Sequence, residues 1–171
     1  MAPMTATLTP DDLVEIELIK QLKYKYLRLL DQHEFDEMRS VLTSDVRARY
    51  SDGKYSFDGV EAVIEFLHES MGAETFLSSH ACHHPEITLN GDGTASGIWK
   101  LEDQVIIGEY DIFLRGAAFY YDDYVKTDDG WLIQETGYRR IFEEMHPRAS
   151  IEGLNLVSSW FSSESKSSEG A

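Results

Sequence analysis

The sequence predicts a single α+β domain in which N-terminal helices pack on a curved, mostly antiparallel sheet. Apolar residues recur at helical spacing up to Leu67, whereas from Ser78 onward apolar and polar residues alternate as in strands, with Gly-containing turns between them. The chain of 171 residues has 42% hydrophobic content, which suits one core better than two.

The first long helix is predicted to begin at Thr9. Thr9 is a common N-cap residue, and Pro10 with the acids that follow it suits a first turn. Apolar residues at spacings of three and four give this helix one buried stripe, which consists of Ile19, Leu22, Tyr26 and Leu30. We expect Lys23 to lie on the wet face, and Asp31, five positions after Tyr26, to border the same cavity as Tyr26.

A short helix over residues 35–43 and a strand over residues 46–50 are predicted next. Val46, Ala48 and Tyr50 alternate with two arginines, so Tyr50 is expected to point to the interior. A third helix around residues 60–67 completes the helical half.

Three further strands are predicted over residues 95–103, 117–127 and 131–141, and the segment 105–116 is expected to be a loop. In the first of them Asp103 shares strand parity with apolar residues. Because burying an unpaired carboxylate is costly, an inward Asp103 either has a partner or is protonated. The alternative is that the strand ends near Leu101.

The charge balance limits the partners. The formal net charge of -16 repels nucleic acids and anionic lipid surfaces, and we expect neither as a partner. No signal peptide and no apolar run of about 20 residues is apparent, so a cytoplasmic protein is expected. The single cysteine, Cys82, fits a reducing compartment.

Three histidines, His80, His83 and His84, lie within five positions. They could bind a metal, but their close spacing on a strand gives poor convergence and no cluster of Cys or carboxylates completes a ligand set. Strand alternation sends His80 and His83 to opposite faces, so His83 is interpreted as structural. We therefore expect no metal and no cofactor.

Several stretches resemble bacterial bile-acid 7α-dehydratase and its SnoaL-like relatives in the nuclear transport factor 2-like superfamily. The resemblance covers roughly residues 14–145 and rests on the segments IKQLKYKYLRLLD, YSDGKYSF, SHACHHPEI, TASGIWKLED, GAAFYYDDYVK and IQETGYRRIFEE. It implies the cone-shaped fold of that superfamily, which hosts dehydratases, isomerases and non-catalytic binding modules.

The resemblance also implies site residues. Tyr26 and Asp31 fall on the active-site tyrosine and aspartate of the family, His80 on its catalytic histidine and Asp103 on the acid of its L-E-D segment. Tyr50 matches a pocket tyrosine of related dehydratases such as scytalone dehydratase.

These residue types suit the elimination of water. A histidine serves as acid or base near neutral pH, a carboxylate such as Asp31 orients it, and a phenol stabilises charge that develops on a carbonyl oxygen. We therefore expect a dehydratase with a His80–Asp31 dyad, acting on a hydrophobic, carbonyl-activated substrate. The resemblance implies that this substrate is one such as a 7α-hydroxy-3-oxo-Δ4 steroid or bile acid. The substrate-binding residues are predicted to be Tyr50, Trp99, Phe119 and Tyr121.

Two alternatives remain open: an isomerase like ketosteroid isomerase, and a non-catalytic ligand-binding module. The domain is predicted to span residues 1–145, followed by an extension over 146–161 that packs on the domain or on a neighbouring subunit, and a disordered tail over 162–171. A homo-oligomer is expected. The resemblance to dehydratases implies a trimer rather than the dimer that other members of the fold form.

Overall fold

The computed structural model describes residues 8–162. The elements in chain order are α1 (Pro10–Asp31), the short 3₁₀ helix η1 (Phe35–Ser40), β1 (Leu42–Tyr50), β2 (Tyr55–Asp58), α2 (Val60–Met71), β3 (Phe76–Leu89), β4 (Thr94–Ile107), the 3₁₀ turn η2 (Gly108–Tyr110), β5 (Ile112–Thr127), β6 (Gly130–Pro147) and the 3₁₀ turn η3 (Arg148–Ser150).

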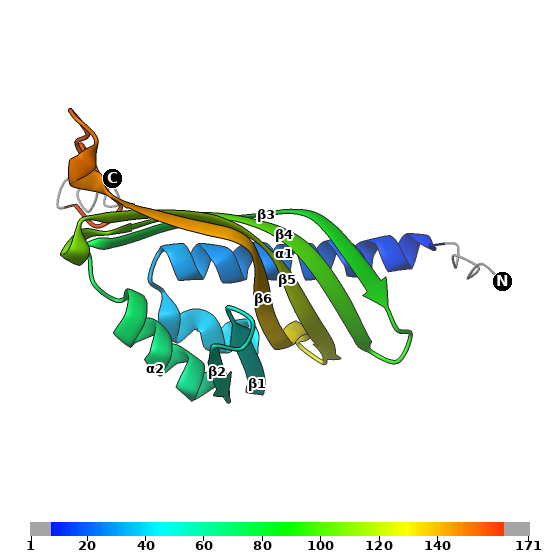
Figure 1. Ribbon diagram of the computed structural model, residues 1–171. Coiled ribbons are helices and arrows are strands. Elements are labelled where there is room, and N and C mark those ends of the chain that lie inside the picture. The colour runs from blue at the N-terminus through cyan, green and yellow to red at the C-terminus, as the bar shows by residue number, and fades with distance from the viewer. Residues whose placement is uncertain (1–7, 163–171) are drawn as a thin grey trace, which may run out of the picture.

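One six-stranded sheet, in the order β2-β1-β6-β5-β4-β3, forms the body of the molecule. All neighbouring strands are antiparallel except β1 and β6, which are parallel. The sheet curves over α1, and α2 lies beside β1 and β2 (Figure 1). The predicted α+β fold with helices on a curved, mostly antiparallel sheet is confirmed.

The start of α1 follows the predicted chemistry. The Thr9 side chain accepts a hydrogen bond from the backbone N–H of Asp12, and the Asp12 carboxylate accepts one from the backbone N–H of Thr9, which forms a capping box. The predicted stripe residues Ile19, Tyr26 and Leu30 are buried. The helix ends at Asp31, beside β3.

The prediction that Lys23 faces water is wrong. Lys23 is fully buried and its ammonium lies 2.8 Å from the carboxylate of Asp122 on β5. Helical periodicity identifies which residues share a face, but it does not reveal that a carboxylate from a strand far along the chain meets the lysine there.

The strands are longer than predicted. Residues 105–116 are not a loop: β4 continues to Ile107, and β5 begins at Ile112 after a single 3₁₀ turn. The alternative that the strand ends near Leu101 is therefore wrong. Apolar residues at both parities, such as Val105, Ile106 and Ile107, hid the alternation that marks a half-buried strand.

The segment after β6 returns to the domain. The Phe161 ring stacks on His33 with ring centroids 4.3 Å apart, just beyond the end of α1. Of the predicted tail, only Ser162 lies within the described residues. No helix in residues 8–162 is long and apolar enough to cross a membrane.

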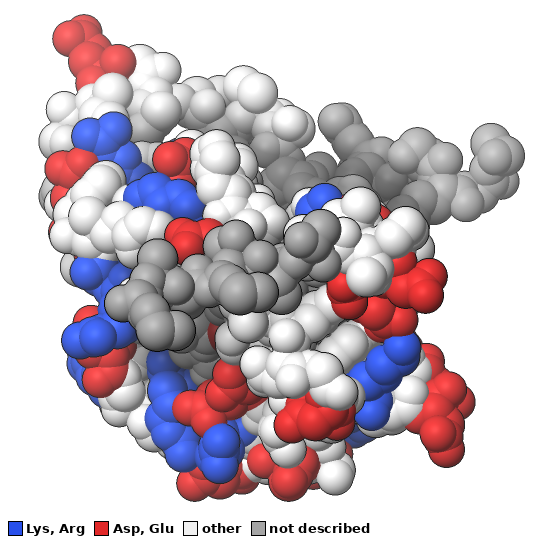
Figure 2. All heavy atoms as spheres, turned by 90° about the vertical axis from the view of Figure 1, so that its right-hand side faces the viewer, with Lys and Arg blue, Asp and Glu red and all other residues white. Residues whose placement is uncertain are grey.

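The surface mixes both charges. On the face seen in Figure 2, Lys and Arg side chains lie among Asp and Glu side chains. Several of these groups form ion pairs across the sheet, such as Arg47 with Glu135 on neighbouring strands.

Candidate active site

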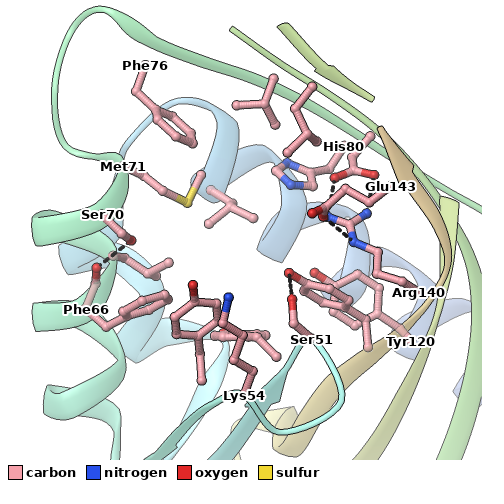
Figure 3. A pocket seen from close by; sticks show the side chains of 18 of the residues that line it. Ser51, Lys54, Phe66, Ser70, Met71, Phe76, His80, Tyr120, Arg140 and Glu143 are labelled. Carbon is pink, nitrogen blue, oxygen red and sulfur yellow. Dashed lines mark hydrogen bonds and ion pairs between the residues drawn. The ribbon is translucent and has the colours of Figure 1, made fainter. Parts of the chain in front are cut away.

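A cavity of about 360 Å³ opens between α1, α2 and the concave face of the sheet. Four of the predicted site residues line it: Tyr26 from α1, Tyr50 from β1, His80 from β3 and Asp103 from β4. Its size falls within the range of small-molecule sites in proteins. Apolar side chains face the opening, among them Phe66 and Met71 of α2 and Phe76 at the start of β3 (Figure 3).

Asp31 and His80 form a close polar pair at this cavity, although Asp31, which was expected to border the cavity, lies behind His80 and is not among the lining residues. The imidazole Nδ1 lies 2.6 Å from one carboxylate oxygen of Asp31, and the backbone N–H of His80 donates to the other over 2.9 Å. Ser78 donates a third hydrogen bond to the carboxylate over 2.8 Å. The end of α1 and the start of β3 are thereby fixed to each other at the point where the imidazole enters the cavity.

The environment keeps Asp31 ionised. Burial raises the pKa of this carboxyl, but the hydrogen bonds and charge of His80 and the hydroxyl of Ser78 outweigh burial, so that its pKa lies below the usual value. A carboxylate on Nδ1 fixes the ring orientation and stabilises the imidazolium. Nε2 is then the nitrogen left for a ligand, since within residues 8–162 no protein group makes a hydrogen bond to it.

Two phenols meet deeper in the cavity. The hydroxyl groups of Tyr26 and Tyr50 lie 3.0 Å apart and are hydrogen-bonded, and burial raises the pKa of both. Both phenols therefore stay protonated at neutral pH. Because one hydroxyl can donate to the other, the second keeps its proton free for an oxygen of a bound ligand.

Asp103 has a partner. Two guanidinium nitrogens of Arg140 donate to its two carboxylate oxygens over 2.6 and 2.9 Å, and Arg140 also pairs with Glu143. Of the two possibilities for an inward Asp103, the structure shows the one with a partner. Gly116 makes room for the pair, because a Cβ there would lie 2.6 Å from Arg140 and 3.0 Å from Asp103.

Sequence reasoning missed Arg140. It lines the cavity together with Tyr138, two positions earlier on β6, and strand alternation places both on one face. This shared parity with an aromatic residue was the signal in the sequence that could have identified Arg140.

Three predicted substrate-binding residues lie away from the cavity, which corrects their placement. Phe119 and Tyr121 point to the outer face of β5 and are exposed, because Tyr120 and Asp122 take the inward parity. Trp99 points inward but is completely buried, and its indole N–H donates to Tyr124. Of the four predicted binding residues only Tyr50 lines the cavity.

A charged network is buried behind the phenols. The Lys23 ammonium lies 3.5 Å from the ring centroid of Tyr120 and 4.8 Å from that of Tyr26, and it is paired with Asp122. Asp122 also accepts hydrogen bonds from Tyr124 and Thr136. With its oxygens satisfied, this network anchors α1 to the sheet.

The other histidines of β3 do not join this site. His83 and His84 are exposed, and a bulge in the pairing with β4 follows His83. In the part of the chain that the structure describes, no group of three His, Cys, Asp or Glu side chains is arranged to hold a metal ion.

Comparison with known proteins gives consistent matches. A model of the SnoaL-like domain matches residues 11–137. An uncharacterized protein of Mycobacterium tuberculosis is 26% identical over 132 residues, which is 74% of this chain and 86% of that protein.

Solved structures share the fold. A candidate scytalone dehydratase from Novosphingobium aromaticivorans has a TM-score of 0.74 at 20% identity, covering 80% of this chain and 91% of its own. The hexachlorocyclohexane dehydrochlorinase LinA-type3 from Novosphingobium barchaimii has a TM-score of 0.73 at 16% identity, covering 87% and 98%.

Proposed function

Because this chain belongs to the SnoaL-like domain family, we propose that its cavity is the active site of a lyase that removes water without a cofactor. The substrate is hydrophobic and carries a hydroxyl group placed for elimination from a carbonyl-activated carbon, as in a 7α-hydroxy-3-oxo-Δ4 steroid or bile acid. The observation that supports this proposal most is the contact of 2.6 Å between Asp31 and His80 at the cavity wall.

In the proposed reaction, Nε2 of His80 removes a proton from the carbon that the conjugated ketone activates. The electrons of that C–H bond form a dienolate, and the negative charge on its oxygen accepts a hydrogen bond from the Tyr26–Tyr50 pair. Asp31 stabilises the imidazolium while it holds the proton.

The dienolate then expels the hydroxyl group. Its electrons return from oxygen and form the second double bond, the C–O bond breaks, and the imidazolium of His80 gives its proton to the departing hydroxide, which leaves as water. Arg140, oriented by Asp103 and Glu143, donates a hydrogen bond to the departing oxygen. The carboxylate of Asp103 thus acts by positioning Arg140 rather than as a proton donor.

The named neighbours support an elimination. A dehydratase removes water and a dehydrochlorinase removes hydrogen chloride, and both reactions take a proton from carbon while a leaving group departs from a neighbouring position. A base paired with a carboxylate and facing an apolar cavity fits this step.

Isomerisation is the main alternative, because the same base and phenols would move a proton without loss of water. Product analysis separates the two, since an isomer keeps the mass of the substrate. A purely ligand-binding role fits less well with an imidazole held in contact with a carboxylate at the cavity wall.

The test is incubation of the purified protein, with a chelator present, with a panel of hydroxylated enones that includes the 7α-hydroxy-3-oxo-Δ4 steroid. Mass spectrometry should detect loss of water with the wild-type protein and not with His80→Ala. His83→Ala is the matched control, because His83 is an exposed histidine on the same strand. Conversion by His80→Ala at the wild-type rate would contradict the role of His80.

A further inference from the structure

The two ends of the cavity differ in charge. At the His80 end, the guanidinium group of Arg140 is held by two carboxylates, Asp103 and Glu143 (Figure 3). Since Asp31 adds a third carboxylate behind His80, this end is unsuited to a negatively charged part of a ligand.

The other end carries a cation that no carboxylate of residues 8–162 pairs with. Lys54 lies in the turn between β1 and β2, lines the cavity and extends into it from the side opposite His80 (Figure 3). Its ammonium lies 4.9 Å from the ring centroid of Tyr55, and within residues 8–162 no carboxylate pairs with it.

The two acids of the β1–β2 hairpin nearest in sequence to Lys54 form ion pairs with other residues. Asp52, in the same turn, accepts a hydrogen bond of 2.7 Å from Arg139 on β6. Asp58, at the end of β2, accepts one of 2.6 Å from Arg49. Within residues 8–162, Lys54 is left without an acidic partner, in a protein whose formal net charge is -16.

An apolar surface joins the two ends. The rings of Tyr55 and Phe66 stack with centroids 5.7 Å apart, and Met71 continues the wall toward Phe76. A ligand that lies along this wall has its apolar body covered, and its far end then comes to the Lys54 ammonium.

We propose that Lys54 is a specificity-determining residue that binds a single negative charge at the end of the substrate remote from the reacting carbon. The substrate class is thus an apolar body with a hydroxyl and carbonyl function at one end and a monoanionic group at the other. This inference rests on the proposed role of the cavity as the substrate site. A single ammonium group matches a monoanion. Among the described residues that line the cavity, the one arginine, Arg140, lies at the His80 end and is held by Asp103 and Glu143.

Binding of two related dyes tests the proposal without any turnover. 1-Anilinonaphthalene-8-sulfonate carries one negative charge, and N-phenyl-1-naphthylamine is its uncharged counterpart. Titration followed by fluorescence should show that Lys54→Gln weakens binding of the sulfonate about threefold, the size of one partly exposed ion pair, and leaves the uncharged dye unaffected. Lys54→Glu should weaken it further, and Lys54→Arg should restore it.

Lys100→Gln is the matched control, because it removes one positive charge beside Phe119 on the outer face of the sheet. Equal weakening by Lys100→Gln and Lys54→Gln, an unchanged affinity in Lys54→Gln, or no binding of the sulfonate by the wild-type protein would overturn the proposal. Because the dyes undergo no reaction, these results stand apart from whether the protein eliminates water.

Discussion

Substitution of Asp31 by Asn tests how much the carboxylate contributes to the action of His80. The change keeps the shape of the side chain and removes its charge, 2.6 Å from Nδ1 of the imidazole. Charge centres about 4 Å apart in a medium of effective dielectric constant about 20 interact by about 4 kcal/mol. The pair is partly open to solvent, with 24% of the Asp31 side chain exposed, and solvent weakens the attraction. We therefore expect Asp31→Asn to remove about 3 kcal/mol of electrostatic stabilisation of the imidazolium.

If the imidazolium forms in the transition state, this loss lowers kcat/KM about 10²-fold. The assay is the initial rate of dehydration of the best substrate in the panel, with circular dichroism to show that the variant is folded. Ser78→Ala is the matched control, because it removes one hydrogen bond from the same carboxylate and keeps its charge, so its loss should stay below about tenfold. A loss in Asp31→Asn no larger than in Ser78→Ala would refute the reasoning.

Three further predictions concern stability, each measured by urea unfolding. Folding lowers the pKa of Asp31, so the ionised carboxylate contributes fully to the free energy of unfolding above the usual pKa of 3.8, and this contribution is lost as the pH falls through the folded-state pKa. The difference in stability between wild type and Asp31→Asn should therefore be larger at pH 7 than at pH 3. A difference that does not change with pH would contradict this. Lys23→Met leaves Asp122 buried without its cation and should lower the free energy of unfolding by about 3–5 kcal/mol. The double variant Lys23→Met/Asp122→Asn should recover part of this loss. A double variant as unstable as Lys23→Met would argue against the ion pair as the cause. Gly137→Ala places a Cβ 2.3 Å from the carbonyl oxygen of Arg49 and should cost about 1–3 kcal/mol by forcing β1 and β6 apart, so a variant of wild-type stability would show that the strands adapt.

The fold class was predictable because local patterns carry it. The cap at Thr9, the buried stripe through Tyr26 and the Gly-containing turns each depend on neighbouring residues, and each appears in the structure. The length of β4 and β5 was not predictable in the same way. Their shared tip, from Val105 to Gly116, is held by cross-strand pairing, which is not a property of either segment alone.

In the candidate site, too, the residues identified by local patterns were predicted and their long-range partners were not. Tyr26, Tyr50, His80 and Asp103 were placed at one cavity by helical and strand periodicity together with the family resemblance. The partners of buried charges were missed. Arg140 meets Asp103 across 37 positions of the chain, and periodicity gives no information about such a pair.

The prediction for Phe119 and Tyr121 failed for a different reason. Adjacent aromatic residues occupy both parities of β5, so composition did not indicate which of them face the helices. The buried Lys23–Asp122 pair shows which face of β5 is inward. Tyr120 and Tyr124 share the strand parity of Asp122 and face the helices, whereas Phe119 and Tyr121 have the opposite parity.

Removal of a proton from an activated carbon by His80 is the step on which the proposed reaction depends. It is tested most directly with a 3-oxo-Δ4 steroid that lacks the 7-hydroxyl group, incubated in D₂O and followed by mass spectrometry and NMR. Because nothing can be eliminated, the wild-type protein should exchange the activated hydrogen for deuterium well above the uncatalysed rate, and His80→Ala should not. No exchange by the wild-type protein, or equal exchange by His80→Ala, would contradict the account.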